Sequence, residues 1–145
     1  MKPSEVRQQV LAEHAALRDK LAELEQIAHP VLEGERGGLR SLRLEGETLL
    51  KLLLDHIQWE DVNLEPALRR SDVWGDARAE KLARDHREQR ELLEHALRGL
   101  QDQSRPAVII ARSLVDLVAL VREDMIDEEA SLLDERVLRD DAGGG

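Results

Sequence analysis

Six side chains that are able to bind a metal ion stand at positions where the apolar pattern of the chain would otherwise place aliphatic residues. They are three imidazoles and three carboxylates: His14, His56, Glu60, His86, Asp124 and Glu128. Imidazole nitrogen and carboxylate oxygen are common ligands of divalent cations in proteins. Ionised carboxylates are costly to bury without a partner, and the apolar stripes around these residues hold no Lys or Arg. The set therefore predicts one or two divalent cations in the core.

The spacing of these residues agrees with a shared site. Asp124 and Glu128 are separated by one helical turn, as are His56 and Glu60, so that each pair lies on one face of a helix.

Apolar residues recur at alternating steps of three and four along four segments, which is the pattern of amphipathic helices. We expect helices over residues 4–28, 39–68, 76–101 and 105–138, separated by breaks that contain proline, glycine or serine. Four long helices with short connections predict an all-α, up-down-up-down antiparallel four-helix bundle, formed by residues 1–139. Residues 140–145, which are rich in Asp and Gly, are expected to form a disordered tail.

Antiparallel packing would bring the polar residues to one level of the bundle. His14 and His86 lie about ten residues after the starts of their helices, and Glu60 and Glu128 lie about ten before the ends of theirs. Because each residue advances a helix by about 1.5 Å, all four should lie in one layer.

The two halves of the chain repeat one another. Glu13-His14 followed by Arg18 parallels Asp85-His86 followed by Arg90, and the segment from His56 parallels the segment from Asp124. The repeat predicts a pseudo-two-fold site for two metals.

Several neighbouring polar residues are expected to have no part in the site. Asp61 and Glu129 are expected to face outward. Arg18 and Arg90 are expected either to support the ligands from behind or, as the safer expectation, to be exposed. His29 and His95 are expected to lie outside the site, His29 far along the helix axis and His95 on the opposite side of its helix from His86.

The amino-acid composition of the chain excludes or disfavours several classes of function. The chain has no cysteine, which excludes disulfides and thiol chemistry, and no tyrosine, which excludes a tyrosyl radical. A net charge of −10 disfavours binding to nucleic acid. No apolar stretch is long enough for a membrane span, and the first residues do not resemble a secretory signal. A cytoplasmic protein with no membrane partner is expected, and the oligomeric state is left open, with Leu50 and Leu54 as possible contact residues.

The motifs resemble those of the hemerythrin and HHE cation-binding family over nearly the whole chain. The resemblance is carried by Glu13-His14-Ala15-Ala16-Leu17-Arg18, His56-Ile57-Gln58-Trp59-Glu60-Asp61, Asp85-His86-Arg87 and Asp124-Met125-Ile126-Asp127-Glu128-Glu129. It implies a centre of two iron ions. Glu60 and Glu128 would bridge them, His14 and His56 would bind one iron, and His86 and Asp124 the other.

Two positions depart from the family's pattern. Arg90 stands where the oxygen carriers of the family have a second His on the third helix, and Asp124 stands where the family usually has His. Anionic oxygen donors stabilise ferric iron more than neutral imidazole does, so the site should autoxidise readily. The same change makes manganese or a mixed-metal site conceivable.

These features favour a non-haem di-iron protein that reacts with oxygen, peroxide or nitric oxide, or that oxidises and holds iron, with oxidase or peroxidase-type activity possible. No catalytic side chain beyond the ligands stands out. Two alternatives remain open: a module that senses metal or oxygen without turnover, and a metal-free bundle with a buried network of histidines and protonated acids.

Overall fold

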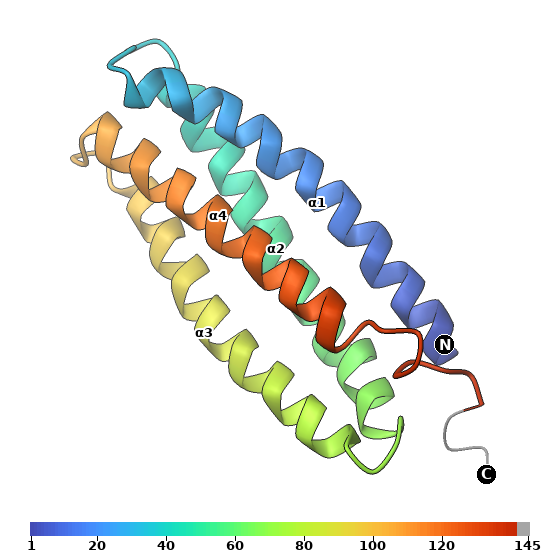
Figure 1. Ribbon diagram of the computed structural model, residues 1–145. Coiled ribbons are helices and arrows are strands. Elements are labelled where there is room, and N and C mark those ends of the chain that lie inside the picture. Colours follow the sequence, from blue (N-terminus) through green and yellow to red (C-terminus); the bar gives the residue numbers. More distant parts are fainter. Residues whose placement is uncertain (142–145) are drawn as a thin grey trace.

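The computed structural model describes residues 1–141, which form four α-helices. Their bounds are α1 Pro3–Leu32, α2 Leu39–Arg69, α3 Gly75–Gln101 and α4 Ala107–Ser131. Successive helices run in opposite directions, and the start of α1 lies at the same end of the molecule as the end of α4 (Figure 1). This confirms the predicted all-α, up-down-up-down antiparallel four-helix bundle. Among the described residues, every helix falls short of the unbroken apolar length that crossing a membrane requires.

The core consists of two apolar clusters with a polar layer between them. The larger cluster is built around Leu21, Leu42 and Leu114, and the smaller one around Val10 and Leu68. Each leucine buried in this way contributes roughly 1.5–3 kcal/mol of hydrophobic stabilisation. The polar layer therefore lies inside a bundle whose stability comes from apolar packing on both sides of it.

The first helix is longer than the sequence suggested. It was expected to stop near Ala28, before Pro30, yet α1 continues through Pro30 to Leu32. A proline in the last turn removes only one backbone hydrogen bond, and the helix geometry persists around it. The chain reverses at Gly34, whose φ of 99° suits glycine and strains other residues. Gly34, and not Pro30, is the effective stop signal.

The fourth helix is shorter than expected. The apolar periodicity continues to Leu138, but α4 ends at Ser131. Beyond it the chain turns irregularly, and its apolar side chains are buried in the smaller cluster: Leu132, Leu133, Val137 and Leu138. The apolar spacing after Ser131 therefore correctly predicted burial but wrongly predicted helix. A segment that folds over the end of a bundle also needs apolar side chains, whatever its backbone conformation.

Two further expectations concern the tail and the surface. Of the tail predicted over 140–145, residues 142–145 lie outside the described residues. The Asp140 carboxylate accepts hydrogen bonds from the backbone N–H and hydroxyl of Ser4, at 2.9 and 2.7 Å. Leu50, considered above as a surface contact residue, is fully buried in the core, and Leu54 is partly buried.

Candidate metal centre

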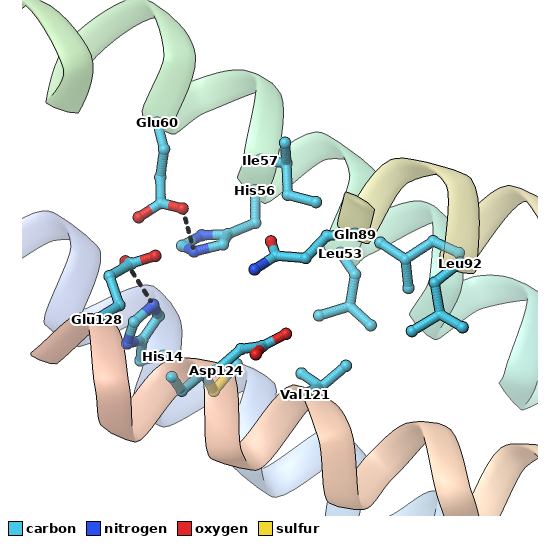
Figure 2. Close-up of a pocket in the computed structure, with 12 residues that line it drawn as sticks. His14, Leu53, His56, Ile57, Glu60, Gln89, Leu92, Val121, Asp124 and Glu128 are labelled. Carbon is cyan, nitrogen blue, oxygen red and sulfur yellow. Dashed lines mark ion pairs between the residues drawn. The ribbon is translucent and has the colours of Figure 1, made fainter. Parts of the chain in front are cut away.

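Four of the six predicted residues converge on one point in the polar layer. His14 comes from α1, His56 and Glu60 from α2, and Glu128 from α4 (Figure 2). One possible ligand atom from each lies within 4.8 Å of all the others. The Nε2 atom of His14 is 3.3 Å from Oε1 of Glu128, and Nε2 of His56 is 3.3 Å from Oε1 of Glu60. Nitrogen and oxygen donors from three helices thus face one another at a distance that one cation can span.

His86 adds a fifth residue from the remaining helix, α3. Its ring is fully buried, and its Nε2 atom lies 3.2 Å from Oε1 of Glu60. Because His56 contacts the same oxygen, the Glu60 carboxylate lies between two imidazoles. All four helices therefore contribute to the layer, as their heights along the bundle predicted.

Asp124 is placed differently from the other five. Its side chain is exposed and, together with Gln89, lines the outer part of the pocket that leads to the cluster (Figure 2). The expectation that Asp124 lies in the buried stripe of α4 is wrong, because α3 packs less closely on α4 than on α2 and leaves this carboxylate accessible to water. Its role as a metal ligand remains a prediction.

The buried layer contains polar atoms that lack a hydrogen-bond partner. Within residues 1–141 these are Nε2 of His56, Oε2 of Glu60 and Oε1 of Glu128. A buried polar atom without a partner costs about 1–3 kcal/mol. All three atoms belong to the same cluster, and all three carry lone pairs when the side chains are deprotonated. These residues therefore fit a divalent cation, which would satisfy all three atoms at once.

The two carboxylates of the cluster influence each other strongly. Burial and the facing Glu60 raise the pKa of Glu128 to about 8. Burial also acts to raise the pKa of Glu60, but its polar contacts with Glu128, His56 and His86 outweigh burial and hold that pKa well below its usual range. Without a cation, this pair of carboxyl groups therefore keeps one proton at neutral pH.

The three imidazoles respond to the same negative charge. Burial acts to lower their pKa values, but the carboxylates in contact with His14, His56 and His86 outweigh it and raise all three. In the metal-free protein, the protons on the rings and on Glu128 balance the negative charge of the carboxylates. A metal ion that binds there has to displace these protons.

A second carboxylate holds the outer nitrogen of His14. Nδ1 of His14 lies 2.8 Å from Oε2 of Glu129, and Arg18 donates two hydrogen bonds to Glu129, each 2.8 Å long. Hydrogen bonds from Arg18 lower the pKa of Glu129, so this carboxylate stays ionised and accepts a hydrogen bond from Nδ1–H of His14. The arrangement fixes the ring with Nε2 directed at the cluster.

The other half of the chain repeats this arrangement. Nδ1 of His86 lies 2.6 Å from Oδ1 of Asp61, and Arg90 donates to the second oxygen of Asp61. The expectation that Asp61 and Glu129 face outward is therefore wrong. Of the two alternatives for Arg18 and Arg90, the contacts favour support of the ligands over simple exposure. The sequence carried a signal for these contacts, because each half places an Arg one turn after its His.

The repeat breaks down beside Asp124. Nδ1 of His56 lies 3.5 Å from Oε1 of Glu13. The counterpart of Glu13 in the second half is Asp85, which pairs at 2.9 Å with Lys81, since Asp124 offers no imidazole to hold. His29 and His95 are exposed, as predicted, and neither belongs to the cluster.

Comparison with known proteins identifies the family. A search of curated proteins found no match, and a search of solved structures found none either. The family profile described as "Hemerythrin HHE cation binding domain" matches residues 6–135, a range that contains the whole cluster and the acids behind it. The chain therefore belongs to the hemerythrin HHE cation-binding domain family.

Proposed function

We propose that this protein binds two iron ions in its polar layer and reacts with oxygen, peroxide or nitric oxide, or oxidises and holds iron, without carrying oxygen reversibly. The observation that supports this best is the set of buried atoms without partners: Nε2 of His56, Oε2 of Glu60 and Oε1 of Glu128. A carboxylate-rich layer of this kind, in the core of a bundle, is the setting in which di-iron and di-manganese sites are built.

The proposed ligand set divides into two halves. His14 and His56 would hold one ion, His86 and Asp124 the other, and Glu60 and Glu128 would lie between them. Bound iron would supply Lewis acidity and one-electron redox chemistry. Manganese or a mixed-metal pair suits the same nitrogen and oxygen donors.

The pocket beside the cluster suits a small reactant. It has an empty volume of about 450 Å³, including the part open to solvent. Its walls are largely aliphatic: Leu53, Ile57, Leu92, Leu93, Val121 and Met125. These side chains keep water scarce beside the carboxylates, while Asp124 and Gln89 at the outer end provide polar groups through which protons can exchange with solvent.

Two features of the chain argue against reversible oxygen carriage. The proposed donors include three carboxylates, which favour ferric iron over ferrous iron. The pocket is also open to water beside Asp124. An oxygen carrier needs its iron to return to the ferrous state each time oxygen leaves, and both features work against that return.

The test is anaerobic loading with ferrous iron, metal analysis after desalting, and then exposure to oxygen, peroxide or nitric oxide. We expect about two iron ions per chain, as in other two-metal sites. We also expect a near-ultraviolet ferric absorption that persists after the gas is removed. Glu60→Gln keeps the shape of the side chain and should abolish most of the binding. Metal content near zero would refute the proposal, and an absorption that disappears on degassing would identify a carrier.

A sensing module is the second candidate, because the cluster joins α1, α2 and α4. A cation bound there would tie three helices together and stabilise the folded state in proportion to its affinity. A large rise in Tm on metal binding, with no turnover of any of the three reactants, would favour sensing.

A further inference from the structure

A pocket beside the polar layer is lined by side chains from all four helices (Figure 2), and its exposed lining residues, Leu92 and Asp124, belong to α3 and α4. Its inner end is formed by Glu60, whose exposed fraction is 1%, and by Glu128. Its outer end is formed by Asp124 and Leu92, which are both exposed. The loose packing of α3 on α4 thus leaves a path from solvent to the buried carboxylates.

The inner end of the path presents oxygen atoms without partners. Within the described part of the chain, Oε2 of Glu60 and Oε1 of Glu128 are buried and accept no hydrogen bond. Both residues line the pocket. A small cation that enters it would therefore find free oxygen ligands at its far end.

The outer end is negatively charged. The carboxylates of Asp85, Glu123 and Asp127 lie close enough to act electrostatically on Asp124. Lys81 pairs with Asp85 at 2.9 Å and with Asp127 at 3.3 Å, but no ion pair within residues 1–141 involves Asp124. Clustered charge of one sign at a cleft raises the local concentration of counter-ions and their rate of association.

We propose that the opening between α3 and α4 is the uptake route for divalent cations, and that Asp124 captures them before they pass to Glu128 and Glu60. Asp124 and Glu128 are one helical turn apart on α4, a rise of about 6 Å, so a cation can move from one carboxylate to the next in a single short step. The inference rests on the proposed metal centre. It assigns Asp124 a role in the rate of loading, in addition to the ligand role proposed above.

The test follows the uptake of cobalt(II), whose visible absorption changes when nitrogen and oxygen ligands replace water. Stopped-flow mixing gives the rate, and metal analysis after desalting gives the number of bound ions. Asp124→Asn removes the charge and keeps the shape. We expect it to slow the uptake of the first ion by about tenfold at low salt. A lower number of ions bound at saturation reports the separate loss of Asp124 as a ligand. Added salt should slow the wild type more than the variant.

The matched control is Asp116→Asn. Asp116 is an exposed carboxylate on the same helix, two turns before Asp124 and away from this pocket. The variant changes the net charge by the same amount, so its uptake rate should stay close to that of the wild type.

A second variant tests the path by size. Leu92→Trp adds bulk at an exposed position of the outer end, where the fold can accommodate it. It should slow uptake and also leave the number of bound ions unchanged.

Each other result contradicts the inference in its own way. An Asp124→Asn variant that loads its first ion at the normal rate and binds one ion fewer would make Asp124 a ligand with no part in capture. Normal rates for both Asp124→Asn and Leu92→Trp would place the route elsewhere. A wild-type protein that binds no cobalt and no iron would refute the proposed metal centre, and the route with it.

Discussion

Nδ1 of His86 lies 2.6 Å from Oδ1 of Asp61, a residue next to the Glu60 that the same ring contacts through Nε2. One short segment of α2 therefore holds both nitrogens of a histidine that belongs to α3. The contact of His14 with Glu128 and Glu129 on α4 is its counterpart. In each half, two adjacent acids thus have different roles. Glu60 and Glu128 face the cluster, and the acids that follow them, Asp61 and Glu129, each orient a histidine ring.

Replacing an orienting acid should weaken metal binding without removing a ligand. Glu129→Gln keeps the shape but loses the charge that holds Arg18 and the Nδ1–H of His14. We expect metal affinity, measured by competition with a chelator, to fall about 10–100-fold while excess metal still fills the site. Glu94→Gln, at an exposed position on α3, is the control and should leave the affinity unchanged. Equal affinities for Glu129→Gln and the wild type would show that the ring needs no such support.

The metal-free protein should lose stability as the pH rises from about 6 to 9. Groups whose pKa is raised by folding stabilise the fold below their unfolded pKa, and this contribution is lost as the pH rises through the folded value. Glu128, with its pKa raised from 4.5 to about 8, and the three buried histidines, raised from 6.5, are such groups. The lowered pKa of Glu60 acts only in acid, because its contribution is lost as the pH falls below 4.5. Urea unfolding of metal-free protein across this range measures the trend, and a stability that rises with pH would contradict it.

Metal binding should release protons, because a cation takes the place of those held on Glu128 and on the imidazoles. Calorimetric titration with metal in buffers of low and high ionisation enthalpy measures this release. We expect the observed heat to increase with the ionisation enthalpy of the buffer, and the metal affinity to rise from pH 6 to pH 8. A heat that is the same in every buffer would mean that the cluster is already deprotonated before metal arrives.

The sequence was sufficient for the bundle and for five residues of the layer, because helical periodicity reports which side of a helix is buried. His14, His56 and His86 are buried as predicted, and Glu60 and Glu128 face one another between them. The pattern of one helix says nothing about how closely its neighbour approaches. For that reason the exposure of Asp124, which follows from the spacing of α3 and α4, could not be predicted from the sequence.

The orienting acids were missed for a related reason. Asp61 and Glu129 follow the cluster residues directly, which turns them about 100° around the helix to the border between core and solvent. At that border a carboxylate can point either way. The partner on the adjacent helix decides, and here an Arg one turn after each His draws the acid inward. Only the internal repeat of the chain, compared position by position, contains that information.

Glu128→Gln should separate the needs of the site from those of the fold. In the metal-free protein the Glu128 carboxyl is buried against Glu60, and its Oε1 atom lacks a partner. A neutral amide of the same shape can donate one N–H to Glu60 and the other to the lone pair on Nε2 of His14, so we expect metal-free Glu128→Gln to be more stable than the wild type at pH 9. A gain of about 1 kcal/mol corresponds to a rise in Tm of roughly 4 °C for a domain of this size.

The same substitution should remove a metal ligand, so that added iron or cobalt raises the Tm of the wild type far more than that of Glu128→Gln. Glu135→Gln, whose side chain is 83% exposed, is the control and should change neither value. If metal-free Glu128→Gln melts below the wild type at pH 9, the carboxylate is stabilised without any cation, and the layer is a self-sufficient network of hydrogen bonds. If metal-free Glu128→Gln melts above the wild type and the variant binds less metal, then the Glu128 carboxylate destabilises the metal-free bundle and its role is to bind the cation.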